Sequence, residues 1–336
     1  MPVKTNYNIQ TEASRVLEST HTQASGFFLK NNWYPISAND TAYIGDSSVL
    51  FPDINYIEAL SVISDYEKDK EKAINSIAKH LQKEKQFKQL SDTFLKKFKQ
   101  RQENILKPVI RKSKETISYL KDKNIQVTVI PTHFGTCGSF SLHNDIETTK
   151  VLHIELILRL DQDARDTIEL YASAITRSVL EWNSNFKWRE TEAVSDFFTK
   201  YVFGFTEHIS TLDRVTKPNV GLRYKSIQFL RRTGLPTGEI ITYDSHENRI
   251  FVANTEITSI LGTYEFRMLR YLIENRNFTV GFDELADVMY AEKADEKYSL
   301  WGISKTVQRV RDKLEQHGIP RDAIKNVKGE GFKLTI

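Results

Sequence analysis

The stretch "ISKTVQRVRDKLE", Ile303 to Glu315, carries apolar residues at steps of four, three and four. Ile303, Val307, Val310 and Leu314 therefore share one face of an α-helix, and this spacing predicts a helix from about Ser299 to Gln316 with that face buried. At 100° per residue the opposite face is a polar ridge. The ridge consists of Lys305, Gln308, Arg309 and Asp312, flanked by Ser304 and Arg311.

The chain continues into "IKNVKGEGFKL", Ile324 to Leu334, in which two β-like runs flank a glycine-rich turn. Gly329 and Gly331 suit positive φ on either side of Glu330, so the stretch predicts a tight hairpin with lysines on both arms. An isolated hairpin is barely stable in water. The helices that precede it are therefore expected to hold it.

From Glu239 the sequence predicts three strands, three helices and this hairpin, in that order. Charge is segregated within this region: residues 297–333 hold nine Lys/Arg against four Asp/Glu, whereas residues 239–296 hold five against twelve. A basic helix fits the major groove of DNA, where arginine pairs with guanine and glutamine with adenine. The pattern predicts a double-stranded DNA-binding region.

Four linked motifs, "ILGTYEFRMLRYLIENRN", "FDELADVMY", "ISKTVQRVRDKLE" and "IKNVKGEGFKL", resemble the OmpR/PhoB-type winged-helix domain of bacterial response regulators. The resemblance implies a sequence-specific transcriptional regulator whose third helix enters the major groove. It implies base contacts by Ser304, Lys305, Gln308 and Arg309, and phosphate or minor-groove contacts by Asn326 and Lys328 on the wing. Arg311, on the flank of the ridge, is counted with these DNA-binding residues.

Three positions depart from the family pattern. Gly262 and Gly281 stand where Thr and Ser helix caps are usual, which costs little because glycine is tolerated there. Trp301 stands where an arginine commonly touches phosphate, so that contact is in doubt.

The rest of the chain predicts a helix-rich α+β domain over residues 1–205, followed by a basic linker at 206–238 and the winged helix at 239–336. Helical spacing runs from Glu67 to Lys123, with Pro108 expected to kink or divide it. Alternation then predicts three short strands before Leu160, followed by two helices. A short helix within the linker, in "SIQFLRR", is left open.

The N-terminal domain lacks the repeated β-α pattern of a receiver, so no sensor kinase is expected as partner. Its order of elements weakly resembles zincin metallopeptidases of the ImmA/IrrE type, which bind zinc through H-E-x-x-H on a helix. The corresponding helix, "IELYASAITRSVLEW", has no histidine, and Glu190 alone matches a ligand. An α+β sensing or oligomerising domain is favoured, and a degenerate zincin-like fold is left open for it. The alternative function is a metal-dependent peptidase-like protein with a DNA-targeting winged-helix module.

Composition narrows the remaining classes. The net charge is +3 over 336 residues, and a single cysteine excludes an intramolecular disulfide framework. With neither a signal-like apolar segment nor a long apolar run, a cytoplasmic protein with no membrane partner is expected. No enzyme activity, cofactor or metal is expected, and a homodimer stays open. Packing roles are favoured for Cys137 and for His133, His143 and His153.

Overall fold

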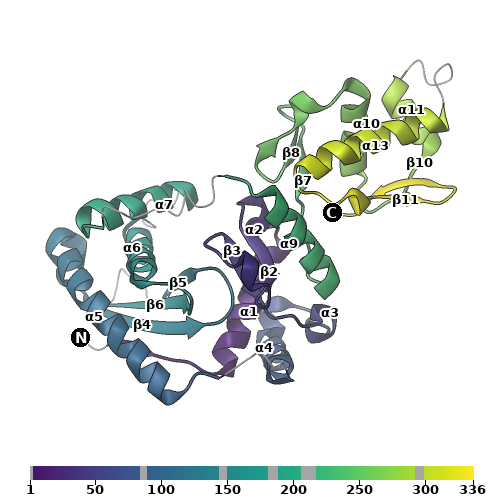
Figure 1. Cartoon of the computed structure of the whole chain (residues 1–336). Coiled ribbons are helices and arrows are strands. Elements are labelled where there is room, and N and C mark those ends of the chain that lie inside the picture. The colour runs from purple at the N-terminus through teal and green to yellow at the C-terminus, as the bar shows by residue number, and fades with distance from the viewer. Residues whose placement is uncertain (1–2, 84–88, 144–149, 181–187, 206–216, 292–298) are drawn as a thin grey trace. The chain divides into compact units, whose positions relative to one another are not determined.

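The computed structural model describes residues 3–83, 89–143, 150–180, 188–205, 217–291 and 299–336 (Figure 1). The chain forms two compact units, and each unit is made of two segments. The N-terminal unit comprises Met1–Ser19 and Ser37–Lys217, and the C-terminal unit comprises Thr20–Ile36 and Pro218–Ile336. Each unit is described by itself below.

Four strands form the sheet of the N-terminal unit, in the order β1-β4-β6-β5. β4 (Asn124–Thr132) and β6 (Val151–Arg159) run parallel, with Thr132 opposite Arg159 at the end of the pairing. β1 (Lys4–Thr5) pairs parallel to β4, and β5 (Gly138–Leu142) pairs antiparallel to β6. The carboxyl ends of β4 and β6 therefore lie side by side.

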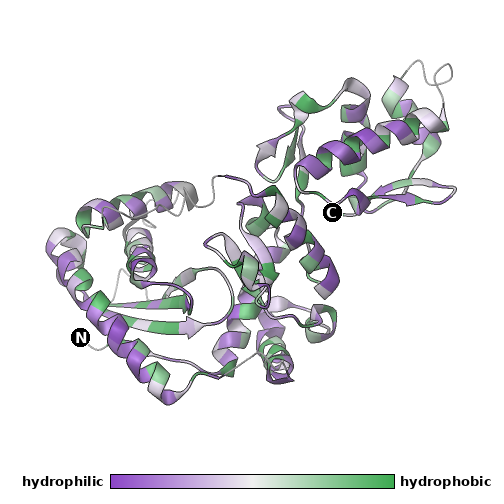
Figure 2. Cartoon of the chain, in the orientation of Figure 1, coloured by the Kyte–Doolittle hydropathy of each residue, from purple (hydrophilic) through white to green (hydrophobic). Residues whose placement is uncertain are grey.

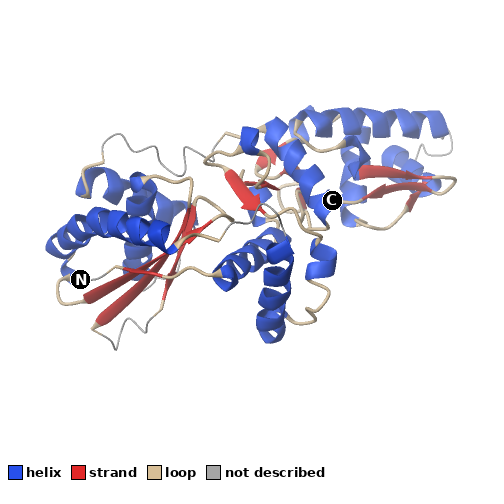
Figure 3. Ribbon diagram, turned by 60° about the horizontal axis from the view of Figure 1, so that its bottom comes forward, coloured by secondary structure: helices blue, strands red, loops and turns tan. Residues whose placement is uncertain are grey.

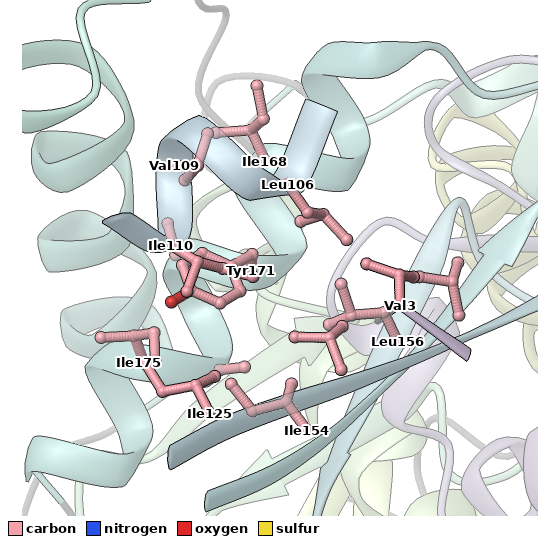
Figure 4. Packing of buried hydrophobic residues seen from close by; sticks show 14 of the residues in the cluster. Val3, Leu106, Val109, Ile110, Ile125, Ile154, Leu156, Ile168, Tyr171 and Ile175 are labelled. Atoms are coloured by element: carbon pink, nitrogen blue, oxygen red, sulfur yellow. The ribbon is translucent and has the colours of Figure 1, made fainter. Parts of the chain in front are cut away.

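Two helices, α5 (Asp92–Thr116) and α6 (Ala164–Leu180), pack against one face of this sheet. Alternate residues of β4 and β6 point into the interface, and Figure 4 shows Ile125 and Ile154 there with Tyr171 of α6. Burying an apolar side chain of this size stabilises the fold by about 1.5–3 kcal/mol. The Ser113 and Tyr171 hydroxyls, 2.8 Å apart, join the two helices within the core.

The other elements of the N-terminal unit lie before and after this core. They are most of α1 (Ile9–Ala24), β3 (Ser48–Phe51), α3 (Tyr56–Ala59), α4 (Tyr66–Lys83), α7 (Trp188–Phe197) and a π-helical turn, η4 (Phe198–Val202). α5 runs through Pro108 without interruption, so the predicted division there is wrong. No helix in the described part of the chain is long and apolar enough to cross a membrane.

The C-terminal unit contains the predicted order of strands and helices (Figures 1 and 3). It comprises α2 (Phe27–Lys30), most of β2 (Tyr34–Ser37), α9 (Val220–Thr233), the antiparallel strands β7 (Ile241–Asp244), β8 (Arg249–Val252) and β9 (Thr255–Glu256), α10 (Thr263–Glu274), β10 (Val280–Gly281), α11 (Phe282–Tyr290), α13 (Leu300–Gln316), and the hairpin β11 (Ile324–Val327) and β12 (Gly331–Leu334). The predicted α+β class is confirmed.

α9 occupies much of the segment that the sequence suggests as a linker. Residues 206–216 of that segment lie outside the described residues, but α9 buries Leu222, Ile227 and Leu230 and is capped by Asn219, whose side chain accepts from the Leu222 amide at 2.9 Å. The segment 206–238 therefore contains a packed helix, which the sequence leaves open, and the boundary between Lys217 and Pro218 lies within it. Residues 20–36, assigned from sequence to the first domain, belong to the same unit as α9.

Arg223 of α9 joins three parts of the C-terminal unit. Its side chain is 1% exposed, and its two terminal nitrogens donate to different acceptors. Nη1 donates to the His317 carbonyl oxygen and Nη2 to Asn32 Oδ1, each at 2.9 Å. Gly318, at φ 77°, follows His317, and a Cβ there would lie 2.6 Å from the Val220 carbonyl oxygen. One buried guanidinium thus ties α9 to the end of α13 and to residues 20–36.

We predict that Arg223→Met destabilises the C-terminal unit by about 2–4 kcal/mol, because two buried acceptors lose their donor while the apolar stem is kept. Urea unfolding of the full chain measures this change. Gln228→Met, at an exposed position of the same helix, serves as control. Equal stabilities of the two variants would show that the guanidinium bonds contribute nothing net.

Candidate nucleic-acid interface

α13 is held by its buried face and by its first turn. Ile303, Val307 and Val310 are fully buried, and α13 contacts both α10 and α11. Ser299 caps the helix by accepting from the Gly302 amide at 3.3 Å. The predicted bounds are therefore confirmed to within one residue, and the polar ridge faces outward. In Figure 2, α13 shows both hydrophilic and hydrophobic residues along its length.

The exposed ridge carries two cations free of internal ion pairs. Lys305 and Arg309 are exposed, and neither forms a salt bridge with any described residue. Ser304 and Gln308 are exposed beside them, and the Gln308 amide donates to Asp312 Oδ1 at 3.2 Å. The structure thus leaves the four predicted base-contacting residues exposed, on the ridge and at its flank.

The acidic residue of the ridge is neutralised from outside the helix. Arg321 Nη1 lies 2.6 Å from Asp312 Oδ1 and 2.8 Å from Glu315 Oε2. These contacts reduce the repulsion that Asp312 would exert on a phosphate backbone. Arg321 had no predicted role, because its partners come from one turn of α13 and Arg321 itself lies beyond that helix, in a short 3-10 turn (Arg321–Ala323).

Trp301 extends the ridge by one turn toward the start of α13. Its side chain is 70% exposed, and Lys305 Nζ lies 4.5 Å from the centroid of its ring. The indole therefore holds the ammonium group near the helix face by a cation–π interaction.

The hairpin forms the wing that the sequence predicts. β11 pairs with β12, and β12 pairs also with β10, in a three-stranded antiparallel sheet. Gly329 has φ 79° at the turn, and a Cβ on Gly331 would lie 1.9 Å from the Val280 carbonyl oxygen. Both glycines are thus required, one by the turn and one by the close approach of β10. Asn326 and Lys328 are exposed on this wing.

Arg311 differs from the other predicted DNA-binding residues. It is half-buried, and its Nε and Nη2 donate to the Ile324 carbonyl oxygen at 3.1 and 2.5 Å. Its guanidinium carbon lies 5.8 Å from the centroid of the Phe332 ring. Arg311 therefore fastens the wing to α13, which its position on the flank of the ridge did not indicate.

Glu265 links the start of α10 to α13. Its Oε2 accepts from the Gly262 amide at 2.8 Å, as the sequence suggests, and also from Lys313 Nζ. Burial by itself raises the pKa of this carboxyl, but the bonds from Lys313 and Gly262 outweigh it and bring the pKa below its usual value. Lys313 is consequently committed to the fold and is not part of the exposed positive surface.

These elements agree with the comparison of the chain with known families. Residues 257–334 match the family model "Transcriptional regulatory protein, C terminal". The OmpR/PhoB-type winged helix is thereby confirmed for this part of the chain, and the match supports a DNA-binding transcriptional regulator. No curated protein matches the sequence. The weaker zincin resemblance of the N-terminal part finds no support.

The N-terminal unit shows a different arrangement from the one that a zincin site would need. Glu190 is exposed, whereas Glu192 of α7 is buried and faces α6, 3.3 Å from Ser173 Oγ and 3.9 Å from Arg177 Nη2. No group of three or more His, Cys, Asp or Glu suited to a metal occurs among the described residues.

His133, His143 and Cys137 of the N-terminal unit have internal partners. His133 Nδ1 lies 2.7 Å from Glu12 Oε1, and His143 Nε2 lies 3.2 Å from Glu155 Oε2. Cys137 is buried and donates from Sγ to the Asp46 carbonyl oxygen at 2.9 Å. These contacts account for His133, His143 and Cys137 as groups that bond within the fold.

Glu192 makes the stability of the N-terminal unit depend on pH. Burial is the main cause that raises its pKa from 4.5 to about 7, against the opposing effects of Arg177 and Ser173. The folded chain therefore holds this proton to higher pH than the unfolded chain, and stability falls as pH rises from about 4.5 to about 7.

We predict that Glu192→Gln removes this loss, so that the variant gains stability over the native chain on the order of 1–3 kcal/mol between about pH 5 and about pH 8. Unfolding in urea at the two pH values measures the gain, with Glu190→Gln as the exposed control. A difference between native and variant that stays constant with pH would contradict the assignment.

Proposed function

We propose that this chain is a sequence-specific, double-stranded DNA-binding transcriptional regulator that inserts α13 into the major groove and grips the backbone with the wing. The observation that carries the proposal is the ridge: Lys305 and Arg309 are exposed cations with no internal ion pair among the described residues. They lie in the region that matches transcriptional regulatory proteins. A cation that the fold does not use is available to a phosphate or a base edge.

Different parts of the surface take different tasks in this proposal. Arg309 and Gln308 have the side chains that form paired hydrogen bonds to guanine and adenine, and Ser304 and Lys305 contact neighbouring base edges. Gln308 must exchange its bond to Asp312 for the base, which Arg321 permits by keeping that carboxylate paired. Asn326 and Lys328 contact the backbone or minor groove, and Arg311 sets the angle between wing and helix.

The remaining parts of the proposal concern partners. The N-terminal unit supplies the signal or the oligomer contact, without a sensor kinase, and the protein acts without catalysis. A homodimer would bind two half-sites spaced by one helical turn of DNA, about 34–36 Å. The peptidase-like alternative is not pursued, because nothing in the described residues favours it.

We predict that Lys328→Ala weakens binding to every duplex and lowers the slope of log affinity against log salt by about 0.9, the effect of one lost phosphate contact. Fluorescence anisotropy over a salt series measures the slope. Lys107→Ala, an exposed lysine on α5 of the N-terminal unit, should leave it unchanged. An unaltered slope for Lys328→Ala removes the wing tip from the interface.

The second test uses duplexes that the full chain selects from genomic DNA. Because the Arg309 side chain points away from the core, we predict that Arg309→Ala keeps its thermal midpoint while it loses about 1–3 kcal/mol of discrimination at one or two positions of the selected site. Competition between selected and scrambled duplexes measures this, with Arg101→Ala on α5 as the exposed-arginine control.

Three results would speak against this role of Arg309. An equal loss of affinity on both duplexes makes it a phosphate contact. No change at all shows that α13 does not contact the bases. A selection that enriches no motif, with weak and salt-insensitive association, would favour a winged helix that contacts only protein.

A further inference from the structure

Arg15 of α1 is buried in the N-terminal unit and has few hydrogen-bond acceptors among the described residues. Its side chain is 7% exposed, and the bond from Nη2 to Thr136 Oγ1, at 2.7 Å, uses one of its five N–H groups. Nε is buried and has no partner, and no described carboxylate forms an ion pair with the guanidinium. A buried cation in this state carries a desolvation cost that the fold does not offset.

The electrostatic surroundings reflect this cost. Burial is the largest cause that lowers the pKa of Arg15 to about 10, and the positive charge of Arg159 acts in the same direction. Glu18, Glu12 and Cys137 act in the opposite direction without overcoming it. The position therefore favours the approach of an additional negative group.

The carboxylates around Arg15 bond to other groups. Glu18, whose charge acts on Arg15, accepts from Ser14 Oγ at 3.4 Å and lies 3.9 Å from Lys70 Nζ. The Glu12 carboxylate accepts from the Thr132 hydroxyl at 2.7 Å, and from the His133 amide and ring at 2.9 and 2.7 Å. Asp161 accepts from Arg159 Nε and Nη2 at 2.6 and 2.9 Å. Neither Glu12 nor Asp161 can bond to Arg15 without losing a buried partner.

The backbone around Arg15 is shaped to admit its guanidinium. Gly135 has φ 91°, and a Cβ at that position would lie 2.3 Å from Arg15 Nε. Gly135 and Thr136 belong to the loop that follows β4, at the carboxyl ends of the parallel strands β4 and β6. In open sheets with parallel strands, ligands bind beyond these carboxyl ends. The carboxyl ends of the parallel strands, the close approach at Gly135 and the incompletely bonded guanidinium of Arg15 thus lie at the same place.

We propose that the N-terminal unit binds a small oxyanion, carried by a carboxylate, sulfate or phosphate group, at the terminal nitrogens of Arg15 beside the loop Gly135–Thr136. The guanidinium fork matches two oxygens of such a group, and a charge-assisted pair of this kind is stronger than a neutral hydrogen bond. The site is independent of the DNA-binding surface and would supply the chain with a chemical input.

Thermal unfolding of the full chain tests the site. Sodium acetate, sulfate and phosphate are titrated against sodium chloride at equal ionic strength. At least one oxyanion should raise the midpoint of the native chain in a saturable way, by about 3 °C or more at saturation. The anion that succeeds identifies the source of the oxyanion group.

Arg15→Gln should abolish the saturable rise, and Arg101→Gln, an exposed arginine of the same unit, should keep it. Sulfate and phosphate also stabilise proteins by exclusion from their surface, but that effect does not saturate and does not require Arg15. Should Arg15→Gln fail to fold, Arg15→Lys keeps the charge and loses the fork, and it should bind at least tenfold more weakly. The proposal is overturned if no oxyanion gives a saturable rise, or if the Arg15 variants keep it in full.

Discussion

The C-terminal unit depends on one buried guanidinium. One terminal nitrogen of Arg223 donates to the His317 carbonyl oxygen at the end of α13, and the second donates to the side chain of Asn32. A buried arginine is tolerated only where its donors find acceptors, so these contacts fix which segments can assemble. Residues 20–36 and α9 are thereby built into the same unit as the winged helix, and the described unit is larger than the family match at 257–334.

Charge in the winged helix is divided between two uses. Three cations bond within the fold. Lys313 holds the start of α10, Arg311 holds the wing, and Arg321 pairs with the acids of α13. Lys305 and Arg309 form no salt bridge with the described residues. A count of basic residues cannot separate the two groups, because the difference lies in the partner of each side chain. The exposed positive surface that remains is narrower than the count of basic residues suggests.

The sequence predicts the C-terminal elements closely because each carries a local signal. The stripe from Ile303 to Leu314, Glu265 three residues after Gly262, and the turn at Gly329 are all readable within one element. α1 is missed because its buried face includes Glu12, Arg15 and Gln23, which interrupt the apolar period. The internal contacts of Arg311 and Arg321 are not visible in the sequence for a related reason. Their partners lie across the turn that follows α13, six to thirteen residues away, and no periodic pattern within one element records such a partner.

Two other buried arginines, Arg159 and Arg223, show how the same structure bonds a guanidinium and can be compared with Arg15. Arg159, 1% exposed, donates from all three nitrogens, to Asp161 and to the carbonyl oxygens of Gly45, Ser48 and Gly135. Arg223 also lacks a partner at Nε, yet both of its terminal nitrogens are bonded. Arg15 has a single acceptor. Since the same fold satisfies the first arginine fully and the second largely, the deficit at Arg15 is local, and an anion supplied from solution is the simplest group that removes it.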